Sequence, residues 1–385
     1  MSKYHKMLAS GLEAKSPSFG IPLQPVTFDG DIGDCFSGHG NLYCTVPDKG
    51  LYVYRESSLE EIFSCSKVLS VICSLPSSLI LLGRDKRFYR YTPSTNLIEE
   101  LALEGARNFS YRNLHHLGEY LIMMAADPND DSRRPTQIIH KYMKEPFSLK
   151  WKVEAPNKRG GALLIDEDNS VFYVIGNNAA IYCLEVETGN PVWNKDISAY
   201  FESRSKIIHA QPALIGDTIV IIYTGVTVAI SAKDGGLVWK REGATASWGL
   251  IANNGMLYQL ESSITDNTRN IITIDAATGK LVSSYQLTAK DNPDFLNSIR
   301  VMNPLHWAIS ETHIIIGWSD ALLTAINPLN GVIDWHEDLG RDQGVSIMPD
   351  IMTSNNRIYC CTSSPDINDF VTTSRVFEGI SGFGG

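Results

Sequence analysis

Oxygen-bearing side chains recur at alternate positions of one polar stretch, where they could bind a cation. Asp127, Asn129 and Asp131 occupy the first, third and fifth positions of a segment spaced like a calcium-binding loop. However, the sixth position is Ser132 instead of glycine, and the twelfth is Ile138 instead of an acidic residue. The stretch therefore favours a solvated, charge-balanced loop over a calcium site.

The histidines and cysteines are poorly spaced for a metal site or a nucleophile. His115 and His116 are adjacent in a predicted strand, so their side chains would point to opposite faces. Cys360 and Cys361 are adjacent in RIYCCTSS, another predicted strand, whereas a vicinal disulfide would need a strained turn. No nucleophile elbow, phosphate-binding loop, zinc-binding helix or dinucleotide motif occurs. We therefore predict no catalytic residue, no metal site and no cofactor.

The elements that would position these residues belong to a recurring unit that ends in glycine and tryptophan. Three copies are GNPVW at 189–193, GGLVW at 235–239 and GVIDW at 331–335. A fourth, IITIDAATGKLVSSY at 271–285, keeps Gly279 but has Ser283 in place of the tryptophan. The glycines are spaced by 46, 44 and 52 residues, which is typical of stacked supersecondary units.

Each unit contains four short predicted strands, A to D, separated by Gly, Asn and Asp turns. In residues 200–243 the strands are IIHAQPALIG, TIVIIYTG, VTVAISAK and LVWKRE. Weaker copies occur at 41–63, 79–103 and 120–154, and a last copy at 344–376 lacks strand D. The segment IPLQPVTF at 21–28 could supply that strand and close a ring of sheets without an exposed edge.

We therefore predict an all-β protein that forms a single β-propeller of four-stranded antiparallel blades. Eight blades fit the count best, and seven fit if the C-terminal stretch is only a tail. The predicted organisation is an N-terminal extension at 1–20, the propeller at 21–377 and a Gly-rich tail at 378–385.

The repeat resembles the pyrroloquinoline-quinone (PQQ) type of propeller repeat. The resemblance rests on an apolar strand, Asp or Asn, then Thr-Gly and Trp, and IDAATGK at 274–280 and LEVETGNPVW at 184–193 carry it best. It implies eight blades in which the strand-D tryptophans dock neighbouring blades together. By this resemblance the docking residues are Trp151, Trp193, Trp239 and Trp335. The family's cofactor residues have no counterparts that can be matched in this sequence.

Composition limits the classes of partner. The net charge is −10 and the charges are scattered, which argues against a nucleic-acid groove and fits a basic protein partner. No apolar run approaches the roughly 18 residues of a membrane helix. The N-terminus lacks the apolar core of a secretory signal, and the seven cysteines fit reduced, buried thiols. These features predict a cytoplasmic protein that does not act at a membrane.

Long connections predict where a partner binds. In a four-stranded antiparallel unit, the A–B and C–D turns lie at one end of the strands, and the B–C loops and D–A connections lie at the other. The second set contains the long predicted loops, namely 126–137, 197–206, 262–270, 288–300 and 363–369. Aromatic residues surrounded by acidic ones are typical of interfaces. The predicted partner-binding residues are Tyr200, Phe201, Glu202, Asp291, Asp294, Phe295, Asp127, Asp130, Asp131, Asp366 and Asp369.

Two functions from different classes remain open. The first is a non-enzymatic, cytoplasmic propeller that binds a protein, as an adaptor or an immunity-type neutralising factor. The second is an enzyme or sensor that binds a small molecule or metal in a central channel, where His209, Gln211 and Asp350 are the scattered polar candidates. Phe201 and Phe295 could also pack back against the strands instead of meeting a partner. The sequence does not predict an oligomeric state.

Overall fold

The structure is a computed structural model, and almost all of its described residues belong to strands. It describes residues 24–29, 35–38, 41–46, 50–55, 58–64, 68–83, 85, 87–102, 114–127, 129–130, 136–156, 161–176, 178–200, 208, 212–223, 225–242, 246–263, 268–289, 304–309, 313–318, 322–338, 346–347, 352–354, 357–365 and 372–380. Apart from the short 3-10 turn η2 (Ser198–Tyr200), the regular elements there are β-strands. The predicted all-β class is confirmed. None of the described segments is a helix that could span a membrane.

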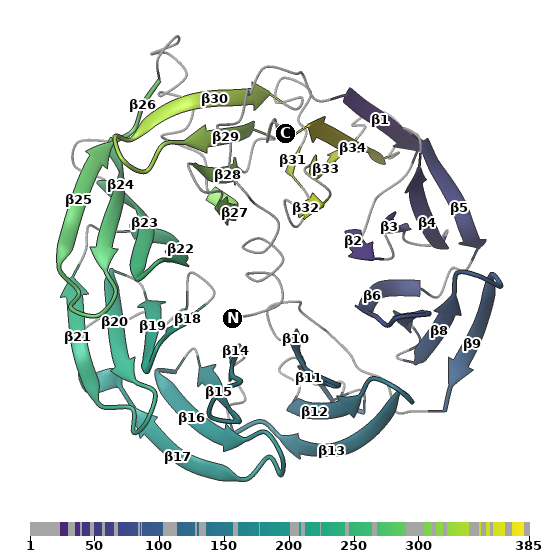
Figure 1. Ribbon diagram of the computed structural model, residues 1–385, viewed down its shortest axis with the longest axis horizontal. Helices are drawn as coiled ribbons and strands as arrows, with labels where there is room; N and C mark the ends of the chain where they lie inside the picture. Colours follow the sequence, from purple (N-terminus) through teal and green to yellow (C-terminus); the bar gives the residue numbers. More distant parts are fainter. Residues whose placement is uncertain are drawn as a thin grey trace. The chain divides into compact units, whose positions relative to one another are not determined.

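The chain divides into two compact units. The first contains Met1–Lys6, Ala106–Leu296 and Pro328–Val332, and the second contains Met7–Gly105, Asn297–Asn327 and Ile333–Gly385. Within the described residues, the strands of both units form eight antiparallel sheets of four or five strands (Figure 1). The closure of these sheets into a ring and the number of blades stay predictions.

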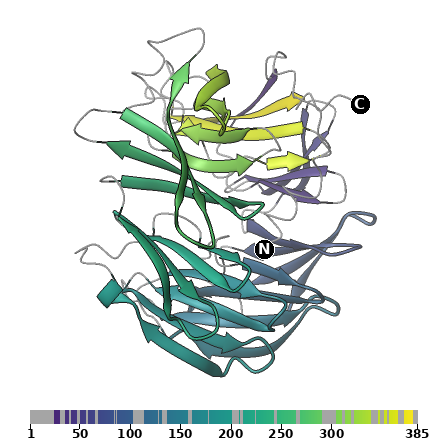
Figure 2. The ribbon, with the colours of Figure 1, turned by 60° about the vertical axis from the view of Figure 1, so that its left-hand side comes forward.

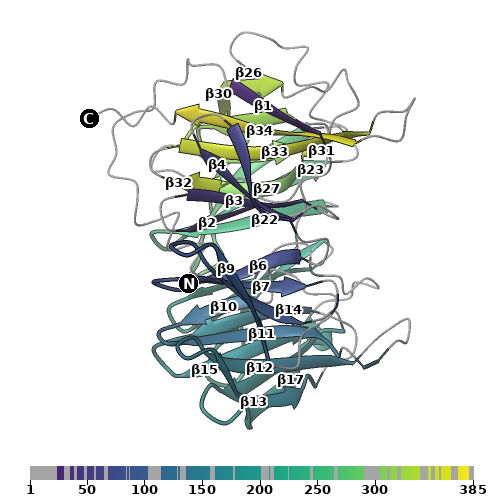
Figure 3. The ribbon, with the colours of Figure 1, turned by 90° about the vertical axis from the view of Figure 1, so that its right-hand side faces the viewer.

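The first unit contains four consecutive four-stranded sheets, each with its strands in sequence order. The first two sheets comprise β10 (Leu114–Leu117), β11 (Tyr120–Ala126), β12 (Gln137–Met143), β13 (Ser148–Glu154), β14 (Gly161–Asp166), β15 (Val171–Gly176), β16 (Ala180–Glu185) and β17 (Pro191–Asp196). The next two comprise β18 (Ala213–Ile215), β19 (Thr218–Tyr223), β20 (Val226–Ser231), β21 (Leu237–Glu242), β22 (Ala246–Asn253), β23 (Met256–Ser263), β24 (Thr268–Asp275) and β25 (Leu281–Gln286). Figure 3 shows β10 to β13 in this order, and the teal and green strands in Figure 2 show the twist that sheets adopt.

The second unit contains sheets of the same kind. Two four-stranded sheets comprise β2 (Cys35–Gly38), β3 (Asn41–Val46), β4 (Gly50–Arg55), β5 (Ser58–Ser64), β6 (Val68–Ser74), β7 (Leu79–Gly83), β8 (Phe88–Thr92) and β9 (Leu97–Leu101). The other strands are β27 (Pro304–Ile309), β28 (Ile314–Trp318), β29 (Leu322–Ile326), β30 (Val332–Asp338), β31 (Ser346–Ile347), β32 (Met352–Ser354), β33 (Arg357–Pro365), β34 (Thr372–Ile380) and β1 (Gln24–Asp29). The first unit also contains the two-residue β26 (Thr288–Ala289).

The N-terminal strand takes the place that the sequence predicted for it. β1 pairs antiparallel with β34, from Gln24 opposite Glu378 to Asp29 opposite Thr373. Strand D of this sheet therefore comes from the start of the chain. One boundary differs from the prediction, because β34 continues to Ile380 although the Gly-rich tail was expected from 378.

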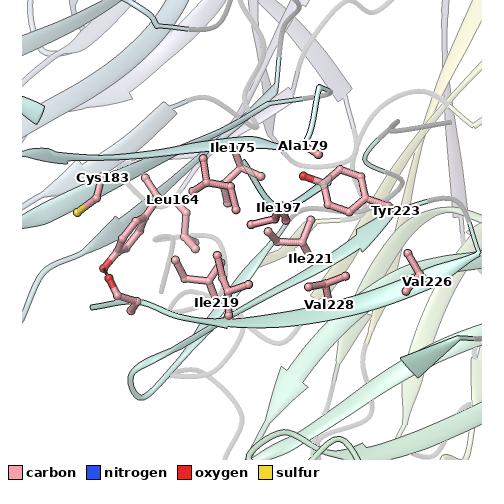
Figure 4. Close-up of a cluster of buried hydrophobic side chains, with 14 residues drawn as sticks. Leu164, Ile175, Ala179, Cys183, Ile197, Ile219, Ile221, Tyr223, Val226 and Val228 are labelled. Carbon is pink, nitrogen blue, oxygen red and sulfur yellow. Dashed lines mark hydrogen bonds between the residues drawn. The ribbon is translucent and has the colours of Figure 1, made fainter. Parts of the chain in front are cut away.

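Where the burial of side chains is described, strands B and C in the middle of a sheet are mostly buried, because both of their faces meet apolar neighbours. In β19, for example, every residue from Ile219 to Tyr223 is buried. By contrast, the outer strand β17 has no fully buried residue. Figure 4 shows the resulting core between the sheet β14–β17 and the sheet β18–β21, where Leu164, Ile175 and Ile197 cluster with Ile219, Ile221 and Val228. Burial of such apolar area is the main stabilising force between sheets.

Candidate functional site

The recurring glycine and tryptophan meet between neighbouring sheets and not within one. Trp193 lies on β17, and its indole Nε1 donates a hydrogen bond to the backbone oxygen of Ala232 in the next sheet, at 3.2 Å. A methyl group added at Gly235 would lie 3.0 Å from the Trp193 ring. Gly235 also has a φ of +70°, which glycine adopts without steric cost. The glycine of one repeat is therefore required by the tryptophan of the preceding repeat.

Trp239 repeats this arrangement one sheet further along. It is 8% exposed, and its Nε1 donates to the backbone oxygen of Ala276 at 2.9 Å. Gly279 has a φ of +70°, and a methyl group there would lie 2.5 Å from the indole ring. A side chain at this position would have to displace the ring or the turn.

The other two predicted docking residues, Trp151 and Trp335, show only part of the contacts seen at Trp193 and Trp239. The Trp151 ring stacks on Phe172 of the following sheet with a centroid distance of 6.0 Å, and a methyl group at Gly189 would lie 3.3 Å from it. Unlike the two tryptophans after it, its buried Nε1 has no hydrogen-bond partner among the described residues. Trp335 is half-buried on β30, opposite Ala325.

The repeat that lacks tryptophan replaces its contact with a different residue. Ser283 takes the place of the indole on β25. Two residues later on the same face of the strand, Tyr285 approaches Gly331, where an added methyl group would lie 2.7 Å from the tyrosine Cβ. Tyr285 is 37% exposed, so this edge is less covered than the edge at Trp239.

Polar pairs also cross between neighbouring sheets. The buried Lys141 donates from Nζ to an Oε of Glu187 at 2.7 Å and lies 4.1 Å from the centre of the Tyr120 ring. The hydrogen bond and the positive charge of Lys141 lower the pKa of the Glu187 carboxyl below its ordinary value. Arg241 of β21 forms an ion pair with Glu261 of β23. These pairs join adjacent sheets.

A buried hydroxyl, carboxylate and thiol lie near one another between β14, β15 and β16, and they are accounted for by packing. The Tyr173 hydroxyl lies 3.2 Å from both an Oδ of Asp166 and the backbone oxygen of Ala232. Burial, and then the nearby charge of Asp166, raise the pKa of the Cys183 thiol to about 12. Because the thiolate is the nucleophile, a thiol with this pKa is unreactive near neutral pH.

The acidic residues of the loop after β11 bind their own backbone. An Oδ of Asp127 accepts from the Asn129 amide at 2.8 Å, and an Oδ of Asp130 accepts from the Thr136 amide at 2.8 Å. The Asp127 amide in turn donates to the Thr136 oxygen at 2.7 Å. These two carboxylates therefore shape the loop.

Tyr200 is more buried than the sequence suggested. It was expected to be an exposed aromatic residue, but it packs against the core shown in Figure 4, and its hydroxyl lies 3.4 Å from the backbone oxygen of Gly235. The tyrosine thus anchors the start of the connection between β17 and β18. Its neighbours Phe201 and Glu202 lie outside the described residues.

Most of the other predicted partner-binding residues also lie outside the described segments, so their role stays a prediction. These are Asp131, Asp291, Asp294, Phe295, Asp366 and Asp369. The polar residues of the alternative channel site, His209, Gln211 and Asp350, lie outside them as well. Cys360 and Cys361 are in β33, as the predicted strand required. Within the described segments, no three His, Cys, Asp or Glu residues are grouped closely enough to hold a metal ion.

Two connections at one end of the strands are long, although others at that end, such as 224–225 between β19 and β20, are as short as the A–B turns. At the A–B end of the first unit, β10 and β11 are separated by 118–119, and β18 and β19 by 216–217. At the other end, 127–136 separate β11 from β12, and 197–212 separate β17 from β18. The long loop predicted at 262–270 is wrong, because β23 and β24 extend through most of it and leave only 264–267 between them.

A set of apolar side chains at the starts of outer strands was not predicted from the sequence. They are exposed to 53% at Val192, 43% at Leu237, 46% at Val238, 49% at Leu281 and 58% at Val282. In the sequence, these side chains belong to the apolar residues that follow each repeat glycine.

Comparison with known proteins places the chain in a family. The family model described as outer membrane protein assembly factor BamB matches residues 148–300 and 203–364, which together cover more than half of the chain. A search of curated proteins found no match.

Solved structures share the fold at low sequence identity. BamB from Moraxella catarrhalis is 16% identical, with a TM-score of 0.59 over 92% of this chain and 99% of its own. The computationally designed Ika8 protein is 13% identical, with a TM-score of 0.58 over 91% and 97% of the two chains.

The quinohemoprotein alcohol dehydrogenase ADHIIG from Pseudomonas putida HK5 is 9% identical, with a TM-score of 0.60 over 94% of this chain and 76% of that one. At these identities the likeness concerns the fold alone. From the extent of the family match we conclude that this chain belongs to the PQQ-type β-propeller repeat family whose model is described as outer membrane protein assembly factor BamB.

Proposed function

We propose that this protein is a non-enzymatic scaffold that binds another protein through its B–C loops and D–A connections. The observation that carries the proposal is the uneven length of the connections, since 127–136 and 197–212 are long whereas the A–B turns of the same sheets are short. Binding residues concentrate on loops that a rigid framework positions. The family description names an assembly factor, and such a factor acts by contacting other proteins.

A basic partner fits the charge of the chain. The net charge is −10, and several of the acidic residues predicted to bind a partner lie in these connections. Charges of opposite sign on two surfaces speed association and discriminate against other partners. An adaptor in the cytoplasm, or a factor that neutralises a basic protein there, would use such a surface.

Charge reversal at one end of the strands tests the proposal. The first variant combines Glu202→Lys, Asp291→Lys and Asp294→Lys in the long connections. The matched control combines Glu119→Lys, Asp168→Lys and Asp217→Lys, which lie in exposed A–B turns and change the net charge equally. Each protein is immobilised, and proteins captured from extracts of the native organism are identified by mass spectrometry.

We expect the first variant to lose a partner that the wild type and the control both capture, with unchanged thermal stability. Equal loss in both variants would indicate general electrostatic attraction, and unchanged capture would remove this end of the strands from consideration. If native mass spectrometry found a bound small molecule and no protein partner, the alternative of a ligand-binding channel would be favoured instead.

A further inference from the structure

Cys35 and Cys44 lie directly opposite each other on two neighbouring antiparallel strands. Cys35 begins β2, Cys44 belongs to β3, and the register makes their Cα atoms partners in the ladder. The two strands are adjacent at one edge of the sheet β2–β5 (Figure 1). Directly opposite residues of an antiparallel pair share one face of the sheet. The hairpin therefore brings together two residues that could be joined by a disulfide.

The spacing of this ladder suits a disulfide. Directly opposite residues have Cα atoms about 4.5–5.5 Å apart, and disulfides span Cα separations of about 4.4–6.8 Å. Only residues 39–40 separate β2 from β3, and Gly38 is the partner of Asn41. Because ladder pairs alternate outward from such a short loop, we expect Cys35 and Cys44 to be a pair without mutual backbone hydrogen bonds. The Cβ atoms lie closer in a pair of this kind, which favours the disulfide.

The other cysteines of the described strands have no cysteine as a ladder partner. Their partners are aliphatic or aromatic residues, namely Ile80 for Cys73, Tyr173 and Trp193 for Cys183, Phe377 for Cys360, and Val376 for Cys361. Among the cysteines that the described strands contain, the register therefore sets one pair opposite each other.

We propose that Cys35 and Cys44 form a reversible disulfide within the chain when the protein meets a small disulfide such as oxidised glutathione. The thiolate of one cysteine attacks a sulfur of the small disulfide, forms a mixed disulfide and releases one small thiol. The thiolate of the other cysteine then attacks the protein sulfur of the mixed disulfide, closes the Cys35–Cys44 bond and releases the second small thiol. Two protein thiols are oxidised, one small disulfide is reduced, and the two thiol protons end on the released thiols.

The bond fixes a short strand at the edge of its sheet. β2 has four residues, and its partner in the sheet order β2-β3-β4-β5 is β3. Edge segments with few contacts open locally more easily than central strands do. The Cys35–Cys44 pair is the one farthest from the loop in the β2–β3 ladder, so the bond holds the whole of β2 against β3. A reducing compartment keeps both residues as thiols, as the sequence suggested, and oxidation locks this edge.

Oxidation of the full-length protein followed by mass spectrometry tests the proposal. The reduced protein is equilibrated at graded ratios of reduced to oxidised glutathione, quenched with acid, denatured and alkylated. The chain has seven cysteines, so the reduced protein should take seven alkyl groups and the oxidised protein five, which is seven minus two. Peptide mapping should then recover Cys35 linked to Cys44 within one chain.

Serine variants separate this pair from the other thiols. Cys35→Ser and Cys44→Ser should each abolish the bond and leave the remaining cysteine as a mixed disulfide with glutathione. The matched control is Cys360→Ser, which also removes a strand cysteine and should keep the bond. Circular dichroism of each variant checks its fold, and the mapping of the wild type needs no variant.

Two further measurements show whether the fold creates the pair. In urea the same titration should need a more oxidising ratio, because the unfolded chain does not hold the two cysteines opposite each other. Hydrogen exchange of the β2 amides should slow on oxidation of the wild type and stay unchanged in Cys35→Ser. Equal oxidation of the folded and unfolded chains, a link from Cys35 to a different cysteine, or no linked peptide in the oxidised folded protein would overturn the proposal.

Discussion

β21 and β25 are equivalent strands of successive sheets, but they end their sheets in different ways. In β21, Trp239 is nearly buried and its Nε1 binds the Ala276 oxygen of the next sheet. In β25, Ser283 stands in the same place, and the neighbouring Tyr285 supplies a partly exposed contact with Gly331 instead. The first repeat therefore docks on the next sheet through a buried indole, whereas the second does so through a tyrosine that stays 37% exposed.

The same two strands also show why glycine and tryptophan recur together. Gly279 both adopts a positive φ and lies against the Trp239 ring, so two independent requirements exclude a side chain there. Where the tryptophan is lost, the glycine is still needed for the turn, and Gly331 retains a φ of +73°. The turn therefore persists in a repeat whose docking contact has changed.

The largest expected effect is the loss of the indole itself. Trp239→Ala should lower the free energy of unfolding by about 3–5 kcal/mol, because it removes a buried aromatic ring and leaves a cavity. Ser283→Ala, at the equivalent position, should change it by less than about 0.5 kcal/mol. Urea denaturation followed by fluorescence and by circular dichroism measures both. Equal costs at the two positions would mean that the sheets are not docked by the tryptophans.

A methyl group at the facing glycine should have the next largest effect. Gly279→Ala should cost about 2–4 kcal/mol, because a left-handed backbone disfavours alanine and the new Cβ would lie 2.5 Å from the Trp239 ring. Gly118→Ala separates these causes, since Gly118 has a φ of +47° but nothing within 4 Å of an added Cβ. We expect about 1–2 kcal/mol there from the backbone alone.

A double-mutant cycle tests whether the extra cost of Gly279→Ala over Gly118→Ala comes from contact with the Trp239 ring. Combined with Trp239→Ala, the cost of Gly279→Ala should fall to that of Gly118→Ala, because the ring it would strike has been removed. If the cost stayed at its full value, the strain would lie in the turn itself and the pairing of glycine with tryptophan would be incidental.

A buried pair of polar side chains joins the sheet β18–β21 to the sheet β22–β25, within an otherwise apolar contact. The Gln259 Nε2 donates to the Thr227 hydroxyl at 3.1 Å. Both side chains are almost completely buried. Thr227→Val should cost about 1–3 kcal/mol, because it leaves the amide unpaired.

Replacing both partners provides the control for this pair. Thr227→Val with Gln259→Leu should cost less than the two single changes together, because no buried polar group is then left unpaired. Denaturant unfolding of the four proteins gives the coupling energy. Additive costs would show that the hydrogen bond does not link the sheets.

Much of the framework could be predicted from the sequence. The predicted strand LVWKRE coincides with β21, and the N-terminal strand pairs in the last sheet, because alternating apolar residues and turn glycines report directly on strands and their ends. The contact between Gly235 and Trp193 could not be predicted in this way. This contact joins consecutive repeats. The sequence spacing of the repeats does not show which residues of neighbouring repeats contact each other.

The candidate binding residues were harder to predict because exposure depends on tertiary packing. Tyr200 was expected to be exposed, yet the core beneath β18–β21 partly covers it. The loop expected at 262–270 is mostly strand: its Ser and Asn residues are typical of loops, but Ser262, Ser263 and Asn270 pair along β23 and β24.

The smallest expected effect concerns the substitute contact at the end of β25. Tyr285→Ala should lower the free energy of unfolding by less than about 1 kcal/mol, since the side chain is already 37% exposed to solvent. Denaturant unfolding followed by circular dichroism measures the change. A cost near that of Trp239→Ala would show that Tyr285 has taken over the docking role of the indole.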